Sequence, residues 1–281
     1  MLPLVLKTMY EELKNRFNET DRLIWIRDEP TQDDLNHLMK QGEASEFDTA
    51  DLKKTMLDDL RQGKAKLVTK SCAIAKVLIV AYPDQIAKIP WKTLANIFRA
   101  FGQAPYKKSW RVVWFMNPTP RTMPIWDKEL DTKTPVGPVN VNGGYTMRCQ
   151  PSTIVIYREE EGIRVLVHEL LHAGCTDSMN QTEEMIEAKT ESWAELFLTA
   201  ILYIDRPRLL KKAWDTQAQW IADQEEILRT EYNVNSPADY AWRYTVGRRF
   251  VLEGLGVRIP AAGADPGATV GRSLRFTAPQ A

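Results

Sequence analysis

The pattern His168-Glu169-Leu170-Leu171-His172 constrains this chain more than any other stretch. Residues four apart share one face of a helix, so the two histidines can point at the same metal ion. Glu169 projects from nearly the same side, where it can take a proton from a water molecule held at that ion. The flanking residues support a helix, because apolar side chains recur at helical spacing before a C-terminal glycine. These residues are Ile163, Leu166, Val167, Leu170, Leu171 and Gly174.

A five-residue pattern can also arise by chance, and the alternative is a buried helix that carries two hydrogen-bonded histidines. A catalytic zinc normally takes three protein ligands and keeps one position for water. The metal hypothesis therefore requires a third ligand elsewhere in the chain. The one other histidine, His37, lies in a polar segment where a surface position is expected. The third ligand should thus be a carboxylate.

The composition of the 281 residues, 44% hydrophobic and 26% charged, is that of a soluble globular protein. Lys plus Arg equals Asp plus Glu at 37 each, so we expect neither a nucleic-acid nor a membrane partner. The longest apolar run, 196–204, is too short to span a bilayer, and the N-terminus lacks the basic lead of a signal peptide. Three cysteines (Cys72, Cys149 and Cys175) do not suggest a disulfide framework, and Cys175 is expected to be a small buried residue. We therefore predict a cytoplasmic or otherwise intracellular protein.

Patterns of apolar residues predict an α+β protein. Residues 1–104 should form a mainly helical N-terminal region, residues 105–258 the region that carries the histidine pattern, and residues 259–281 a disordered tail rich in Gly, Ala and Pro. Strands are predicted at 110–116, 139–147 and 152–157. Helices are predicted at 90–102, 182–203, 207–232 and 236–253. The segment 71–82 is a short buried element, either helix or strand.

Four glutamates, Glu184, Glu187, Glu191 and Glu195, lie close to one face of the helix predicted at 182–203. Like charges on one face repel, so a nearby cation would explain them, and the alternative is a solvated acidic face. Eighteen residues, 173 to 190, separate His172 from Glu191. The spacing is therefore HExxH-x18-E, with Glu195 one helical turn further on.

This spacing resembles that of the gluzincin clan of zinc metallopeptidases, over about residues 139 to 203. The resemblance implies a zincin-like catalytic domain with one Zn²⁺ bound by His168, His172 and Glu191. It also implies that Glu195 orients a ligand histidine. Glu187 is the alternative third ligand. The pattern E-x-x-A-E is similar to the aminopeptidase branch, although Thr190 stands where that branch commonly has asparagine. Metzincins are excluded, because Cys175 and Ser178 occupy the positions of their glycine and last histidine.

The same resemblance places Asn142, Gly143 and Gly144 on the edge strand that binds the substrate backbone. The segment lacks a GAMEN-type sequence, which anchors the substrate N-terminus in aminopeptidases, so endopeptidase or carboxypeptidase action is favoured. The tetrahedral oxyanion needs a donor besides zinc, and Tyr240 and Tyr244 on the last predicted helix are the candidates. The run of strands into the histidine helix also resembles uncharacterised predicted proteases of large DNA viruses.

The sequence thus predicts a zinc-dependent peptidase that acts on a polypeptide, with Glu169 as the general base. The alternative is a structural or scaffold protein, for example of a virion, that keeps the zincin fold and binds zinc without turnover. Glu169 favours catalysis, since a non-catalytic metal site needs no base.

Overall fold

A computed structural model describes residues 1–125 and 135–279. Within these residues the chain is an α+β protein that contains one six-stranded sheet. The chain divides into two compact units, each made of segments that are distant in sequence. The sheet unit comprises Asn15–Pro120 and Asn142–Asp177, and the helical unit comprises Met1–Lys14, Arg121–Val141 and Ser178–Ala281.

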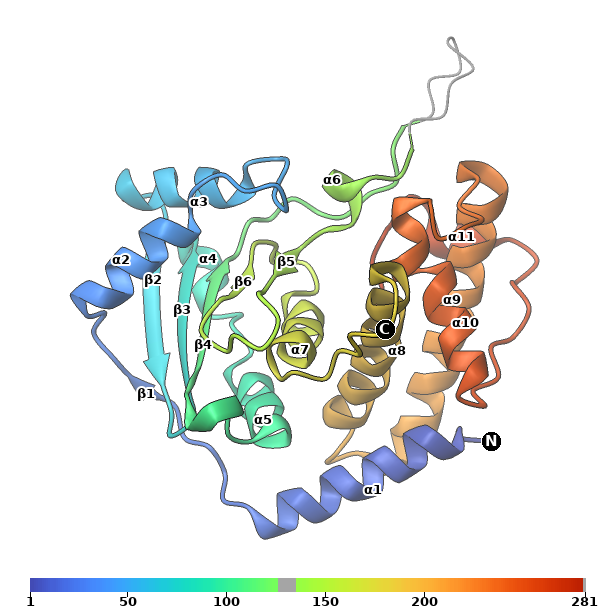
Figure 1. Cartoon of the computed structure of the whole chain (residues 1–281), viewed down its shortest axis with the longest axis horizontal. Coiled ribbons are helices and arrows are strands. Elements are labelled where there is room, and N and C mark those ends of the chain that lie inside the picture. Colours follow the sequence, from blue (N-terminus) through green and yellow to red (C-terminus); the bar gives the residue numbers. More distant parts are fainter. Residues whose placement is uncertain (126–134, 280–281) are drawn as a thin grey trace. The chain divides into compact units, whose positions relative to one another are not determined.

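The sheet has the strand order β1-β2-β3-β4-β6-β5 (Figure 1). Its strands are β1 (Ile26–Arg27), β2 (Lys66–Ser71), β3 (Ala75–Ala81), β4 (Trp110–Phe115), β5 (Gly144–Tyr145) and β6 (Ile154–Ile156). The central strands β3, β4 and β6 run parallel, and β5 joins β6 in the antiparallel sense. Parallel strands that are covered on both faces are almost wholly apolar, as β3 and β4 are. The strand predicted at 110–116 is therefore confirmed, and the segment 71–82 contains a strand.

The strand predicted at 139–147 is much shorter in the structure. Residues Pro138–Val141 form a helical turn, α6, and only Gly144–Tyr145 pair as β5. Proline is favoured in a first helical turn, and the Asn140 side chain accepts a hydrogen bond from the Gly137 amide at 3.0 Å. Turn formation therefore replaces strand pairing over the first half of the predicted strand.

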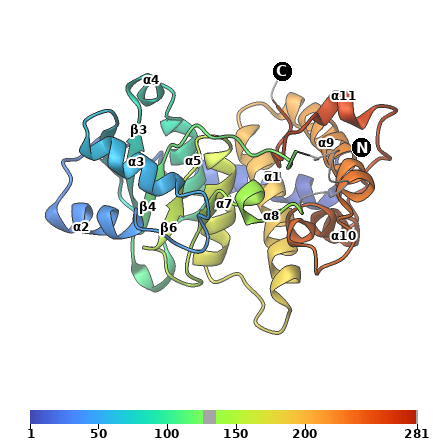
Figure 2. The ribbon, with the colours of Figure 1, turned by 90° about the horizontal axis from the view of Figure 1, so that it is seen from above.

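Helices cover both faces of the sheet within the sheet unit (Figures 1 and 2). Helices α2 (Gln32–Gln41) and α3 (Leu52–Arg61) lie on one face, where they share a core with β3, β4 and β6. Helices α5 (Trp91–Phe101) and α7 (Gly162–Ala173) lie on the other face. Two short elements, α4 (Pro83–Ile86) and η1 (Pro105–Lys107), lie in the connection from β3 to β4. Half of the sheet comes from the segment 1–104, for which the sequence predicts mainly helices.

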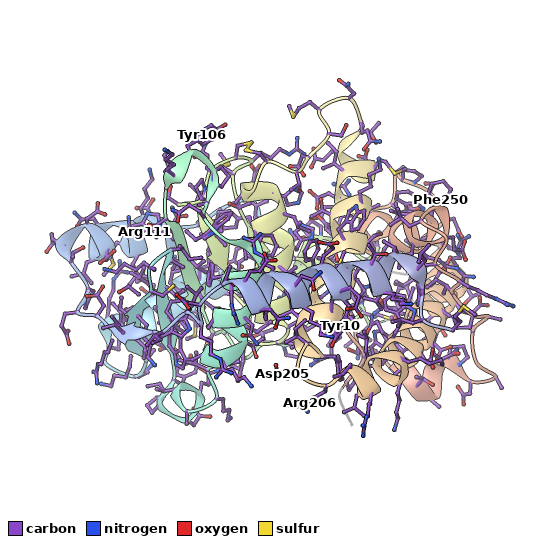
Figure 3. All side chains as sticks on the ribbon, turned by 90° about the horizontal axis from the view of Figure 1, so that it is seen from below. Tyr10, Tyr106, Arg111, Asp205, Arg206 and Phe250 are labelled. Atoms are coloured by element: carbon purple, nitrogen blue, oxygen red, sulfur yellow. A yellow bond between two sulfur atoms is a disulfide. The ribbon has the colours of Figure 1, made fainter. Side chains whose placement is uncertain are left out.

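The helical unit is built around α8. Its elements are the first turns of α1 (Leu4–Glu19), α6, α8 (Glu183–Leu202), α9 (Pro207–Tyr232), η2 (Tyr240–Tyr244), α10 (Val246–Gly254) and α11 (Pro266–Val270). Tyr10 on α1 donates a hydrogen bond to the carbonyl of Ile204 beside Asp205 (Figure 3). The helices predicted at 182–203 and 207–232 are confirmed. The helix predicted at 236–253 is interrupted, because Thr245 leaves the helical conformation with φ −129° and ψ −84°.

The C-terminal segment 259–279 packs within the helical unit, in contrast to the disordered tail that its composition predicts. Three of its apolar side chains, Val270, Leu274 and Phe276, are buried. Trp220 and Gln217 on α9 donate hydrogen bonds to backbone carbonyls of the segment at 2.9 and 2.8 Å. A few anchors spaced among Gly, Ala and Pro residues thus hold the segment. Among the helices of residues 1–125 and 135–279, none has the length and apolar character needed to cross a membrane.

Candidate metal centre

The helix α7 packs so closely on the sheet that its first residue must be glycine. A Cβ atom at Gly162 would lie 2.1 Å from Cζ2 of Trp114, whose indole nitrogen donates to the carbonyl of Arg158 at 2.8 Å. The helix is buried along nearly its whole length. Its last turn is capped as predicted, because the Gly174 amide donates to the carbonyl of Leu170 at 2.8 Å. The sheet therefore fixes the position of the two histidines.

His168 and His172 lie one turn apart on α7 and bring their Nε2 atoms together. The two atoms are 3.0 Å apart, and the side chains are almost fully buried. Two nitrogens bound to one tetrahedral zinc lie about 3.3 Å apart, since Zn–N bonds are about 2.0–2.1 Å long. The same separation suits an N–H···N hydrogen bond between the rings. The pair is thus compatible with either a shared metal ion or a hydrogen bond.

The surroundings of His172 set the tautomer that a metal ligand would need. Both carboxylate oxygens of Asp177 lie 2.9 Å from Nδ1 of His172, so the proton of this ring belongs on Nδ1. Arg148 in turn lies 3.1 Å from the Asp177 carboxylate. The Nε2 atom of His172 then presents a lone pair toward His168. A carboxylate that holds the outer nitrogen of a histidine is the usual second partner of a ligand histidine.

Asp177 has no role in the sequence-based prediction. It follows His172 by five residues and reaches back to it because the chain turns at Cys175, which has a left-handed φ of 62°. The signal in the sequence is an acidic residue within one turn beyond the end of the histidine helix. That signal is weak by itself, because a carboxylate at this distance can equally point into solvent.

Glu169 is buried and lies close to the edge strand β5. A Cβ atom at Gly144 would lie 3.4 Å from Oε1 of Glu169, 2.4 Å from Cγ1 of Val165 and 2.7 Å from the carbonyl oxygen of Val155. Only glycine therefore allows the strand to approach α7 this closely. The carboxylate of Glu169 consequently faces the backbone of an edge strand.

The three residues predicted to bind substrate differ in their contacts. The carbonyl of Gly143 accepts a hydrogen bond from the Tyr157 amide at 2.8 Å, within the ladder to β6. The Asn142 side chain donates to the carbonyl of Phe47 at 3.3 Å, and the backbone carbonyl of Asn142 accepts a hydrogen bond from Nε of Arg158 at 2.9 Å. Bonded and non-bonded pairs alternate in an antiparallel ladder, so the backbone groups of Gly144 point away from β6. Gly144 is thus the position of this group best suited to bind an added strand.

The side chain of Tyr145 anchors β5 from the opposite face of the sheet. Its hydroxyl lies 3.0 Å from Nζ of the buried Lys53, and its ring stacks on Phe47 at 5.1 Å. Burial raises the pKa of Tyr145 to about 12, and nearby Asp48 and Glu169 add to the shift. The phenol therefore stays protonated at neutral pH, and the edge strand is held on both faces.

The expectation that the cysteines form no disulfide is wrong. Cys149 and Cys175 are bonded to each other, and Cys72 is the free cysteine. Cys175 is also exposed rather than buried. The two bonded positions are 26 residues apart, on either side of β6 and α7, so neither spacing nor composition indicates that they meet.

The predicted carboxylate ligands lie on α8, in the helical unit. Thr182 caps this helix as predicted, with its hydroxyl accepting from the Met185 amide. Glu191 and Glu195 are both buried, and Glu195 forms a buried ion pair with Arg248 at 3.1 Å. Arg248 is thus one partner of Glu195, and the role of Glu195 beside a ligand histidine stays a prediction.

Tyr240 and Tyr244 lie in the 3₁₀ turn η2 and not on an α-helix as the sequence predicts. Their rings are 5.7 Å apart, and η2 packs against α8. Burial raises the pKa of Tyr244 well above its usual value, and the neighbouring Glu187 carboxylate raises it further. A phenol in this environment remains a hydrogen-bond donor at neutral pH.

Comparison with known proteins gives no further guide, because no family model, curated protein or solved structure matches the chain.

Proposed function

We propose that this protein is a zinc-dependent peptidase in which His168 and His172 bind the metal and Glu169 is the general base. The observation that carries the proposal is the histidine pair, with its two Nε2 atoms 3.0 Å apart and Asp177 on the outer nitrogen of His172. Two imidazoles and a carboxylate are the donor set of many catalytic zinc sites. A purely structural pair of histidines would not need the buried carboxylate of Glu169, which lies between them in the sequence.

A glutamate of α8 would complete the ligand set. Glu187, one helical turn before Glu191, is one candidate for this third position. The spacing HExxH-x18-E supports Glu191 instead. The two carboxylates are four residues apart and lie on one face of α8, so either assignment uses the same face of the helix. Glu195, one turn beyond Glu191, would then act behind the ligands.

A zinc ion at this site would polarise the scissile carbonyl and lower the pKa of a water molecule toward neutrality. Glu169 accepts the proton of the attacking water and later donates it to the leaving amine. Asp177 holds His172 in the tautomer that directs Nε2 inward. Tyr240 or Tyr244 donates a hydrogen bond to the developing oxyanion.

The edge strand supplies the place for a polypeptide substrate. The outward N–H and C=O of Gly144 can pair with an extended peptide, which then passes over Glu169. Two strands, β5 and β6, precede α7 in sequence, and β5 is antiparallel to its neighbour. This order supports a zincin-like arrangement, and the lack of an N-terminus anchor favours endopeptidase or carboxypeptidase action.

Substitution of the general base tests the proposal. Glu169→Gln should keep one zinc per chain and reduce hydrolysis of a peptide library by about 10²–10⁴-fold, because only proton transfer is removed. Glu226→Gln, at an exposed position of α9, is the matched control. Full peptidase activity in the Glu169→Gln variant would refute the mechanism. Zinc binding without hydrolysis in the unaltered protein would instead support the scaffold alternative.

Two further variants assign the third ligand. Glu187→Ala and Glu191→Ala are compared for the zinc content that survives dialysis. Loss of zinc in Glu191→Ala alone would support Glu191 as the third ligand, as the sequence spacing predicts. Loss of zinc in Glu187→Ala alone would support Glu187 instead. Retention of zinc in both would refute a glutamate ligand from this face of α8.

A further inference from the structure

The disulfide Cys149–Cys175 encloses the candidate metal centre in sequence. Cys149 lies in the loop between β5 and β6, and Cys175 lies just beyond the end of α7. The covalent ring between them contains all of β6 and α7, and thus both histidines and Glu169. The bond therefore links the loop of the edge strand to the end of the histidine helix.

Both ends of the disulfide converge on His172. The backbone amides of Cys149 and Cys175 each donate a hydrogen bond to the carbonyl of His172 at 3.1 Å. Arg148, the residue before Cys149, forms an ion pair with Asp177, two residues after Cys175. The carboxylate of Asp177 contacts Nδ1 of His172. The cross-link thus lies beside the contacts that orient this imidazole.

The cross-linked segments are under backbone strain and one of them is open to solvent. Cys149 and Cys175 have φ values of 60° and 62°, a left-handed conformation that residues with a Cβ rarely adopt. Cys175 is exposed and Cys149 is half-buried, so a reductant can reach the bond. Exposed disulfides are the labile and regulatory ones, whereas structural disulfides resist reduction. The disulfide is one of the contacts that hold these two turns beside each other.

We propose that the Cys149–Cys175 disulfide is a redox latch that holds Asp177 against His172 and thereby controls metal binding at the site. The inference rests on the proposed function, since it concerns the same histidines. A thiolate of a dithiol reductant attacks one sulfur and forms a mixed disulfide as the Cys149–Cys175 bond breaks. The second thiol of the reductant then releases the protein. Two electrons and two protons pass to the cysteines, and the reductant becomes a disulfide.

Reduction should weaken zinc binding because it loosens the carboxylate that fixes the His172 tautomer. Loss of such a carboxylate partner typically lowers metal affinity 10- to 100-fold. The ion pair with Arg148 still favours the bound position of Asp177, so we expect the lower end of that range. Peptide hydrolysis should fall with zinc occupancy when zinc is limiting.

The test compares the full chain in its oxidised and reduced forms. Dithiothreitol reduces the protein and is removed without air before zinc is titrated in competition with a chelating dye. The reduced form should bind zinc about tenfold more weakly. Cys149→Ser and Cys175→Ser should both behave like the reduced protein in either condition. Cys72→Ser, which leaves the disulfide intact, is the matched control and should keep the difference.

Three outcomes would overturn the latch, and one separates it from the proposed function. Equal zinc affinity in both redox forms refutes the latch and leaves the peptidase proposal standing. Weak binding in Cys149→Ser alone would mean that the Cys175 thiol acts by itself, which also refutes it. Hydrogen exchange at residues 146–150 and 175–178 can be measured without metal. Equal protection of these amides in the oxidised and reduced forms would also refute the latch. Absence of zinc from both forms would refute the proposed function, with hydrogen exchange still reporting on the latch.

Discussion

Two buried carboxylates of the sheet unit, Asp34 and Asp177, have similar surroundings and different consequences. Their side chains are 5% and 4% exposed, and each contacts an arginine. Asp34 lies 2.6 Å from Lys76 and 2.8 Å from Arg111, which is labelled in Figure 3. Asp177 lies between Arg148 and the imidazole of His172. The second partner thus distinguishes the two sites.

A carboxylate between fixed cations neutralises charge and holds three elements together. Asp34 on α2 joins β3 through Lys76 and β4 through Arg111, and it also closes the capping box with Thr31. Its removal leaves two cations close together and partly buried. The contribution of Asp34 should therefore appear in the free energy of unfolding.

A carboxylate that contacts one nitrogen of an imidazole determines which nitrogen carries the proton, and so affects what the other nitrogen can bind. Asp177 sets the proton on Nδ1 of His172, and the lone pair of Nε2 then faces His168. The contribution of Asp177 should therefore appear in ligand affinity rather than in folding. Burial and charge are alike at the two carboxylates, so the different roles expected for them rest on their partners.

The largest effect should come from removal of a histidine. His172→Ala should reduce zinc affinity on the order of 10³-fold, because a site worth about 10–16 kcal/mol loses one of its few ligands. Zinc affinity is measured by competition with a chelator of known affinity. His37→Ala on α2 is the control and should bind zinc like the unaltered chain. Equal affinity in the two variants would exclude a metal site at the histidine pair.

Asp34→Asn should mainly affect folding. Breaking a buried ion pair costs about 3 kcal/mol or more when the remaining charge has no other partner. Lys76 and Arg111 keep Asp28 and Asp33 as partners at 2.9 Å, so the loss should be about 3 kcal/mol at most. Urea unfolding followed by tryptophan fluorescence measures this loss. Asp58→Asn removes an exposed pair with Arg61 and should change the free energy of unfolding by less than about 1 kcal/mol. Weaker zinc binding in Asp34→Asn at a temperature where it is folded would contradict the comparison.

Asp177→Asn should show the opposite profile. Zinc affinity should fall 10- to 100-fold, up to about 2.7 kcal/mol, since an amide no longer fixes the tautomer of His172. The unfolding free energy of the metal-free chain should change by only about 1 kcal/mol, because Arg148 is 39% exposed. Arg148→Ala keeps the carboxylate on the imidazole and should reduce zinc affinity less. A larger loss in Arg148→Ala would mean that the ion pair, not the carboxylate, orients the ring.

The sequence predicts the parts of this site that depend on local periodicity. The helix of His168 and His172 and its glycine cap follow from spacing and residue type. The position of Gly144 on an edge strand was instead an expectation from the family resemblance. Helical geometry relates residues four apart, so the facing histidines need no tertiary information. The helix α7, its cap and its facing histidines were therefore predictable.

The features that were missed depend on contacts made after the chain has turned. Asp177 reaches His172 only because Cys175 adopts a left-handed conformation, which no periodic pattern encodes. Cys149 meets Cys175 across the packed pair of β6 and α7. The helical unit is built from three segments of the chain and the sheet unit from two, and these segments alternate along the sequence. A prediction that divides the chain into consecutive regions cannot describe such units. Long-range packing decides each of these features.

The smallest expected effect is the change in the free energy of unfolding as the pH is lowered. This measurement tests Asp34 and does not depend on zinc binding. Burial alone would raise the pKa of Asp34, but hydrogen bonds from Lys76 and Thr31 lower it to about 2, from 3.8 in the unfolded chain. A carboxylate with a lowered folded pKa stabilises the fold at any pH above 3.8, and this contribution of about 2 kcal/mol disappears as pH falls toward 2. Other carboxylates also become protonated in this range, so the informative quantity is the difference in unfolding free energy between the unaltered chain and Asp34→Asn. That difference should shrink between pH 4 and pH 2. A difference that stays constant over the range would show that Asp34 remains ionised or never contributes, and its ion pairs would then have no part in the comparison with Asp177.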